Sequence, residues 1–280
     1  MTSTPRTWFI TGTSSGFGRQ LTEQLLARGD RVFATLRRRG ALDDLAAAHG
    51  DRLHVAELDV TDGAAIRRVV DQAFAALGRI DVVVNNAGYG LFGAAEELSD
   101  EQIRHQIDTN VVGSIQVTRA ALPHLRAQGG GRILQLSSMG GQMAYPGLSL
   151  YHTTKWAIEG FFESVAQEVA PFGIEVTLVE PGSASTNFGS DSLVSAPAIA
   201  AYDRTPVGDF RRVRMSGAFP RPGDPAKMAR AMIASVDHTP APKRLTLGGD
   251  AYAKMHEALT QRLAALEAQK DVAFSTDVAG

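Results

Sequence analysis

The amino-acid sequence predicts an α/β protein built on one doubly wound parallel sheet of about seven strands, with helices on both faces. Two observations predict it. Short β-branched or apolar runs alternate with longer helical patterns along most of the chain, and this order is typical of βαβ units. The run Val82-Val83-Val84 is continuously apolar, as expected for a strand that is buried on both faces of a parallel sheet.

The predicted elements follow one another at regular intervals. Strands are predicted at 8–10, 30–36, 53–56, 81–84, 132–136, 174–179 and 244–247. Helices are predicted at 16–27, 64–77, 99–128, 151–172 and from about 250 to 269. Gly29 is placed to end the first helix, and Ser99 is placed to cap the third, with Glu101 and Gln102 in its first turn.

The whole chain, residues 1–280, is predicted to be one domain, because neither an internal repeat nor a linker interrupts the pattern. Residues 7–182 form the expected core. The stretch 183–224 is irregular and holds four prolines, and so long a loop in a compact domain usually closes over a site. Residues 271–280 are expected to be a mobile tail.

Composition excludes several classes of protein. Lys plus Arg number 28 against 30 Asp plus Glu, so the net charge of −2 argues against a dedicated nucleic-acid binder. The chain has no Cys, which excludes disulfide scaffolds and thiol nucleophiles. No His, Asp and Glu cluster has metal-ligand spacing, so no metal is expected. Short apolar runs and the absence of a signal-peptide pattern predict a soluble, cytoplasmic protein without a membrane partner.

A glycine-rich turn lies where the first strand passes into the first helix. Gly12, Gly16 and Gly18 let the backbone approach a pyrophosphate, while Ser14 and Ser15 add hydroxyl donors. The start of the helix presents free N–H groups with partial positive charge. In the first βα unit, this turn predicts a dinucleotide site and hence a Rossmann fold.

The end of the second strand indicates which dinucleotide is bound. Proteins that use NAD usually place Asp or Glu there to hold the ribose 2′-hydroxyl. Here the strand ends with Arg37, Arg38 and Arg39, and Arg37 follows Gly18 by about 20 residues, as that carboxylate would. A guanidinium suits a 2′-phosphate, so NADP is the predicted cofactor. Arg38 and Arg39 could equally be part of a solvated charge run.

Tyr151 and Lys155 are spaced i, i+4, which places both on one face of a helix. A phenol has a pKa near 10, but an ammonium about 4 Å away contributes about 4 kcal/mol at an effective dielectric of 20. That is roughly 3 pK units, enough to bring the phenolate within reach of neutral pH. Ser138 follows the strand 132–136, where its hydroxyl could bind a carbonyl oxygen, and Ser137 competes with it for this role.

Together these motifs resemble the short-chain dehydrogenase/reductase family in its non-extended branch, closely over residues 7–186. The segment 32–37 is similar to the 17β-hydroxysteroid and retinol dehydrogenase subgroup, although this does not make the substrate a steroid. The residues that carry the family resemblance are Gly12, Gly16, Gly18, Asp59, Val60, Asn85, Asn86, Ala87, Gly88, Asn110, Ser138, Tyr151, Lys155, Pro181 and Gly182.

The resemblance implies a role for each of four polar residues. It makes Tyr151 the general acid/base and Lys155 the residue that holds the nicotinamide ribose. It makes Ser138, rather than Ser137, the residue that polarises the substrate oxygen, and Asn110 a residue that helps hold a water in a proton relay. The cofactor-binding residues it implies are Gly12, Ser14, Ser15, Gly16, Phe17, Gly18, Arg37, Asp59, Val60, Asn86, Ala87, Gly88, Tyr151, Lys155, Pro181, Gly182 and Thr186.

The expected activity is an NADP(H)-dependent interconversion of a carbonyl and an alcohol. Met139, Met143, Tyr145 and Phe188, with Tyr202, could line an apolar substrate pocket, or could equally be ordinary packing residues. His152 is expected at a surface or interface, since i and i+1 do not share a helix face.

The family also implies a homodimer or homotetramer formed through the helices at 99–128 and 151–172. Two alternatives stay open. One is a non-catalytic NADP-binding sensor on the same fold. The other is an isomerase or dehydratase that uses transient oxidation.

Overall fold

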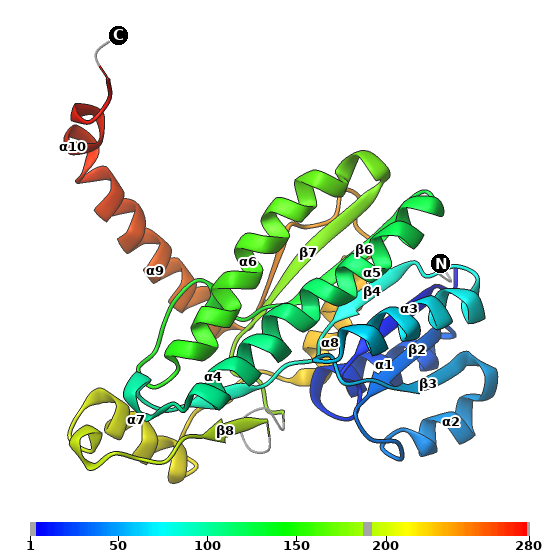
Figure 1. Cartoon of the computed structure of the whole chain (residues 1–280), viewed down its shortest axis with the longest axis horizontal. Helices are drawn as coiled ribbons and strands as arrows, with labels where there is room; N and C mark the ends of the chain where they lie inside the picture. Colours follow the sequence, from blue (N-terminus) through cyan, green and yellow to red (C-terminus); the bar gives the residue numbers. More distant parts are fainter. Residues whose placement is uncertain (1–3, 187–191, 279–280) are drawn as a thin grey trace.

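Seven parallel strands form the central sheet in the order β3-β2-β1-β4-β6-β7-β9 (Figure 1). The structure is a computed structural model that describes residues 4–186 and 192–278. The strands are β1 Thr7–Thr11, β2 Arg31–Leu36, β3 Leu53–Glu57, β4 Val82–Asn85, β6 Gly131–Leu136, β7 Ile174–Pro181 and β9 Arg244–Leu247. The predicted doubly wound parallel sheet is therefore confirmed, and the strand bounds agree with the prediction to within two residues.

The strand order reverses direction between β1 and β4. From β1 the chain proceeds outward through β2 and β3, then returns to the centre at β4 and proceeds the other way. Loops that follow β1 and β4 consequently leave in opposite directions and open a crevice at the carboxyl ends of the strands. Ligands of open α/β sheets bind in such a crevice.

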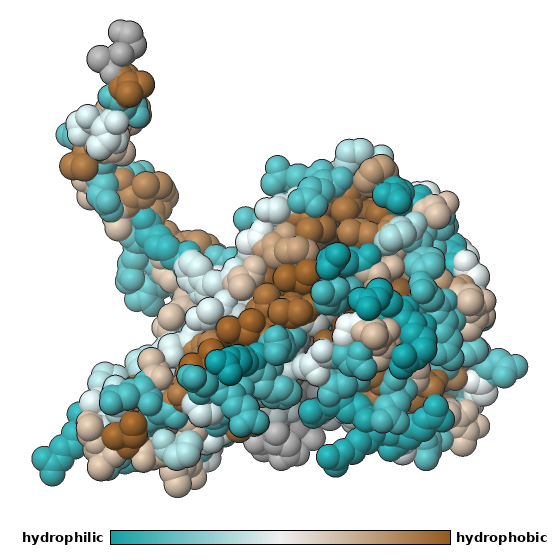
Figure 2. Space-filling view, in the orientation of Figure 1, coloured by the Kyte–Doolittle hydropathy of each residue, from teal (hydrophilic) through white to brown (hydrophobic). Residues whose placement is uncertain are grey.

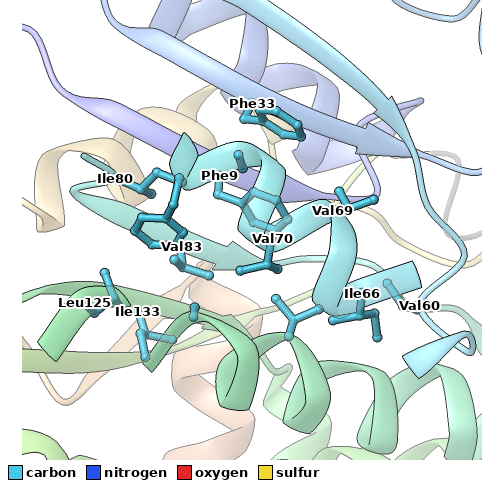
Figure 3. Packing of buried hydrophobic residues seen from close by; sticks show 14 of the residues in the cluster. Phe9, Phe33, Val60, Ile66, Val69, Val70, Ile80, Val83, Leu125 and Ile133 are labelled. Carbon is cyan, nitrogen blue, oxygen red and sulfur yellow. The ribbon is translucent and has the colours of Figure 1, made fainter. Parts of the chain in front are cut away.

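Helices cover both faces of the sheet, because successive strand residues point to opposite sides. On one face, Phe9, Val83 and Ile133 pack under the helices α3 Gly63–Leu77, α5 Gly113–Ala127 and α6 Ser149–Val169 (Figure 3). On the other face, Trp8 and Ile10 pack with α1 Gly16–Arg28 and α8 Pro225–Ser235. The short helix α2 Asp43–His49 lies between β2 and β3 in the chain.

One long helix predicted over 99–128 contains a wider turn. The structure has α4 Asp100–Ile107, then a π-helical turn at Asp108–Val112, and then α5. Ser99 caps α4 as expected, because its Oγ accepts a hydrogen bond from the Gln102 N–H at 3.2 Å. Such π turns are frequent at functional sites, and this one holds Asn110.

The stretch 183–224 contains short elements that the sequence pattern did not indicate. Within it lie β8 Leu193–Ser195, which pairs in parallel with β5 Gly90–Phe92, and the helix α7 Pro206–Met215. Three-residue strands are too short to show a period. A second difference concerns the tail expected from residue 271, because a helix, α10 Lys270–Ser275, follows α9 Gly249–Glu267 there.

Helix α9 projects from the rest of the molecule together with α10 (Figure 1). Ala251 and Met255 are buried at its base, whereas every residue from 259 to 278 is exposed. No helix in the described part of the chain is long and apolar enough to cross a membrane.

Candidate active site

A cavity of about 580 Å³ lies at the carboxyl ends of the strands, where the fold places the crevice. Its walls come from the turn after β1, from the ends of β2, β4, β6 and β7, from the start of α6, and from residues between 181 and 221. Of the predicted cofactor-binding residues, all but Gly18 line this cavity. Gly18 instead packs beneath the turn.

The glycine turn is held against the end of β4. The Asn86 Nδ2 amide donates to the carbonyl oxygens of Thr11 and Gly12, each at 2.8 Å, and the Thr11 Oγ1 accepts from the N–H groups of Asn86 and Ala87. Gly12 has a φ of +71°, which favours glycine. A Cβ on Gly18 would lie 2.2 Å from the Gly12 oxygen. The turn can therefore keep its shape only with glycine at both positions.

Gly18→Ala is expected to destabilise the protein by about 1–3 kcal/mol, since the added methyl group overpacks the turn. The free energy of unfolding in urea measures this. Gly63→Ala is the matched control at the start of another helix, where the added Cβ has its nearest contact at 3.7 Å from a flexible Arg67 side chain. Equal stability of the two variants would contradict the tight packing of the turn.

The start of α1 is suited to an anion. No acidic side chain lies in its first turn, and its N-cap residue, Ser15, makes no side-chain capping bond, so the first N–H groups of the helix are not used by a cap. Arg37 lines the cavity beyond the end of β2, and among the described residues it forms no ion pair. A helix N-terminus and a guanidinium in one cavity fit a dinucleotide that carries an additional phosphate.

Asp59 lies in the same part of the cavity. Its Oδ1 accepts hydrogen bonds from the Thr61 N–H at 2.9 Å and the Thr61 hydroxyl at 2.8 Å. The helix that follows is capped by Asp62, not by Asp59. The Asp59 carboxylate is thus held by Thr61 and does not cap the helix that follows.

Tyr151 and Lys155 lie on the buried side of α6, and both line the cavity. The Lys155 Nζ donates to the Leu136 carbonyl oxygen at 2.9 Å and lies 5.7 Å from the centre of the Tyr151 ring. Ser138 follows β6, and its Oγ accepts from the Gly140 N–H at 3.0 Å. The structure therefore brings together the three residues that the sequence singled out. Ser137 also lines the cavity.

The environment of Tyr151 differs from the sequence-based expectation. Burial raises the pKa of Tyr151 to about 12, and the hydrogen bond with Ser138 opposes this rise. Burial also lowers the pKa of Lys155 to about 8, partly offset by the charge of Glu159. Lys155 is not among the causes of this shift, so the expected lowering of the Tyr151 pKa by Lys155 is not seen here; burial of the phenol disfavours its charged form.

Asn110 is buried at the π turn and links three elements. Its Nδ2 donates to the Tyr89 carbonyl at 2.8 Å and to the Thr154 Oγ1 at 3.1 Å, while its Oδ1 accepts from the Tyr89 N–H at 3.0 Å. The side chain thereby joins Tyr89, directly before β5, to Thr154 of α6, one residue before Lys155. This position fits a residue that supports α6 next to Lys155.

His152 is not at the surface, as the sequence suggested, but buried beside Tyr151. One ring nitrogen, Nδ1, lies 2.9 Å from the Gly140 carbonyl oxygen, and the other, Nε2, accepts from the Tyr145 N–H at 2.9 Å. Burial lowers the pKa of His152, so the neutral ring holds these contacts. His152 thereby connects two segments of the cavity wall, one at Gly140 and one at Tyr145. The position of His152 on its own helix could not predict these contacts.

The substrate end of the cavity agrees only in part with the prediction. Met139 and Tyr145 line it, whereas Met143 packs beside Met139, Ala251 and Met255. The Tyr202 hydroxyl points elsewhere and donates to Glu96 at 2.9 Å. Phe188 lies outside the described residues. Lining residues that the sequence analysis missed include Leu148, Leu193, Val194, Phe210, Arg214, Phe219 and Arg221.

Comparison with known proteins agrees with this arrangement. The short chain dehydrogenase family model matches residues 6–193. The chain belongs to the short-chain dehydrogenase family. A short-chain dehydrogenase from Streptomyces avermitilis is 43% identical and has a TM-score of 0.91, with 98% of this chain and 100% of that chain covered.

Two curated relatives extend the comparison. Oxidoreductase BOA17 of Botryotinia fuckeliana is 38% identical over 245 residues, which are 87% of this chain and 89% of that protein. Human 17-beta-hydroxysteroid dehydrogenase type 1 is 36% identical over 212 residues, 72% of this chain and 63% of that protein. The resemblance to the short-chain dehydrogenases is thereby confirmed, and the protein is an oxidoreductase of this family.

Proposed function

We propose that this short-chain dehydrogenase interconverts a carbonyl and an alcohol with NADP(H), and that Tyr151 is its general acid/base. The observation that carries the proposal is the placement of Tyr151, Lys155 and Ser138 in one cavity with the glycine turn and Arg37. The residue that transfers the proton and the turn that would hold the dinucleotide then line the same cavity. The hydride donor and the hydride acceptor can therefore be held close together.

When bound, the dinucleotide supplies or accepts the hydride. During reduction Tyr151 donates a proton to the carbonyl oxygen, and during oxidation it accepts a proton from the alcohol. Ser138 donates a hydrogen bond to the same oxygen as charge develops on it. Lys155 orients the ribose and places a positive charge beside the phenol, and Asn110 supports the relay to solvent. General acid/base catalysis of this kind contributes about 10²–10⁴ in rate.

NADP is favoured over NAD by the end of β2. Arg37 occupies the place where a carboxylate would otherwise hold the ribose hydroxyl, and Ser15 in the glycine turn offers a hydroxyl nearby in the cavity. Related structures include both cofactors. A serine dehydrogenase, 28% identical to this chain, was solved with NADP+, and a 3-ketoacyl-(acyl-carrier-protein) reductase from Brucella melitensis, 25% identical, with NADH. The preference of this chain consequently depends on its own Arg37.

The described cavity-lining residues between 192 and 221 cover the substrate in this proposal. Leu193, Phe210 and Phe219 reach the cavity from this segment. Phe210 is at the centre of an aromatic group, with ring centres 5.5 Å from Phe92, 6.2 Å from Tyr145 and 5.3 Å from Phe219. The rings of Tyr145, Phe210 and Phe219 line the cavity and give it an apolar wall.

Consumption of NADPH with reactive diketones and quinones tests the proposal directly. The expected result is a substrate-dependent fall in NADPH absorbance that is faster than with NADH. Steroids, retinoids, sugars and β-ketones extend the panel toward the natural substrate. Binding of NADPH without turnover of any carbonyl or alcohol would instead support a sensor protein.

We further propose a homodimer or homotetramer formed through α5 and α6. Figure 2 shows a band of apolar side chains along these helices. Trp156 of α6 is 43% exposed and Phe172, just after α6, is 45% exposed, and the exposed Ala157 and Gly160 would allow another helix to approach closely. A two-fold pair would cover the same band on both copies.

Ala157→Glu is expected to raise the dissociation constant of this oligomer more than a hundredfold, because a carboxylate buried without a partner costs about 3 kcal/mol or more. Light scattering across a concentration series measures the change. Arg39→Glu, away from α5 and α6, is the control and should leave the mass unaltered. A wild-type protein that is monomeric at micromolar concentration would refute the oligomer.

A further inference from the structure

A group of charged side chains from α6, β7 and β9, none of which lines the cavity, is centred on Arg244. The Arg244 guanidinium of β9 bonds to Glu159 of α6 and Glu180 of β7, and also reaches Glu163 of α6. The side chain of Glu180 is 0% exposed and that of Glu159 7%. Two carboxylates are therefore enclosed around one guanidinium.

Neutral donors complete the group. The Gln142 amide lies 3.4 Å from a Glu159 oxygen and 3.2 Å from a Glu180 oxygen, and the Thr246 hydroxyl lies 3.2 Å from the other oxygen of Glu180. These contacts fix the carboxylate of Glu159 between the loop after β6 and strand β9. Enclosing a carboxylate is costly, so its charge must be compensated by neighbours.

Glu159 follows Lys155 by one helical turn, on the same face of α6. Its charge is the one that raises the pKa of Lys155 against the effect of burial. Lys155 and Arg244 carry two positive charges, and Glu159 and Glu180 carry two negative charges. With the exposed Glu163 left aside, these four groups have no net charge only if Lys155 is protonated, which links the state of the lysine to the cluster.

If these charges served only to hold β9 against α6, the buried carboxylate of Glu159 would not be needed. Arg244 already pairs with the exposed Glu163 of α6, and it already reaches Glu180 of β7. Glu159 adds a second buried carboxylate, which burial disfavours and which the Ser137 hydroxyl and Arg244 help to keep ionised by opposing the rise in its pKa. In addition to the contact between β9 and α6, Glu159 contributes a negative charge next to Lys155.

We infer that Glu159 is a positioning residue that keeps the Lys155 ammonium charged at neutral pH, and that Arg244 and Glu180 hold Glu159 in place for this task. The inference rests on the proposed function, in which charged Lys155 assists Tyr151. The ionisable groups packed around the pair are Tyr151 and Glu163 on α6, Glu180 on β7 and Arg244 on β9.

Glu159→Gln is the test, measured as kcat for NADPH-dependent carbonyl reduction between pH 6 and pH 10. An opposite charge within about 4–6 Å typically shifts a pKa by about one unit or more. Without that charge Lys155 should lose its proton at lower pH, so we expect the alkaline limb of the kcat profile to move down by about one pH unit. The rate at pH 6 should change less than threefold.

Glu163→Gln is the matched control. It removes the same kind of side chain from the same helix and the same guanidinium, but from an exposed position, and it should leave both limbs of the profile in place. Glu159→Asp should restore most of the shift, because it returns the charge. If Glu159→Gln does not fold, Glu159→Asp becomes the test, with a smaller downward movement of the same limb expected.

An unmoved alkaline limb in the folded variants would overturn the inference, even if their stability falls. Lys155→Met separates this failure from failure of the proposed function. If Lys155→Met abolishes reduction while Glu159→Gln leaves the profile unmoved, only the role of Glu159 is wrong. If Lys155→Met reduces carbonyls as fast as the wild type, the proposed mechanism itself is wrong.

Discussion

Tyr151→Phe is expected to lower kcat for NADPH-dependent carbonyl reduction by about 10²–10⁴-fold, the usual contribution of a general acid/base. The substitution removes one oxygen and keeps the ring, so the wall of the cavity is preserved. NADPH affinity should change little, because the glycine turn and Arg37 are untouched. Steady-state kinetics and a fluorescence titration with NADPH measure the two quantities separately.

Tyr145→Phe is the matched control for this experiment. Tyr145 lines the same cavity, but it is held there by its ring, which packs near Phe210, and by its backbone N–H, which bonds to His152. We expect kcat within a few-fold of wild type. If Tyr151→Phe were as active as Tyr145→Phe, the proton would come from another group and the proposed mechanism would be refuted.

Arg37→Asp is expected to reverse the cofactor preference. A charge-assisted hydrogen bond contributes about 1.5–3 kcal/mol, and the new carboxylate would repel a 2′-phosphate while accepting a bond from a ribose hydroxyl. The ratio of kcat/KM for NADPH over NADH should therefore fall by about a hundredfold or more. Parallel kinetics with the two dinucleotides and one carbonyl substrate give this ratio.

Arg39→Asp has the same change of charge two residues further on, at an exposed position that does not line the cavity. The ratio of kcat/KM for NADPH over NADH in this variant should stay close to that of the wild type, apart from a small long-range effect of net charge. A preference for NADPH that persists in Arg37→Asp would place the phosphate elsewhere and would remove the argument for NADP.

Much of the fold could be predicted because parallel strands and their helices carry strong local patterns. The strand residues Val82, Val83 and Val84 are all apolar because helices cover both faces of the sheet. The glycine turn requires Gly12 and Gly18, because a Cβ at either position would lie too close to other backbone atoms. In such places the chemistry of neighbouring residues decides the structure, and a sequence shows it directly.

Other features depend on partners that are distant in the chain. His152 is buried because Gly140 and Tyr145 fold back over α6, which no property of its own helix indicates. The pairing of β5 with β8 joins segments about a hundred residues apart through strands of three residues. Met143 packs against Ala251 and Met255 of α9, and it is not among the residues that line the cavity.

The sequence by itself determined the doubly wound sheet, the glycine turn, the short-chain dehydrogenase resemblance and the residues Ser138, Tyr151 and Lys155, because each is encoded in spacing within a few turns or strands. Only the tertiary structure decided the directions of the Tyr151 and Lys155 pKa shifts, the aromatic wall around Phe210 and the enclosure of Glu159 with Arg244 and Glu180. Burial and the Coulomb energy of a group depend on everything packed around it, and in this protein those neighbours come from α6, β7 and β9 at once.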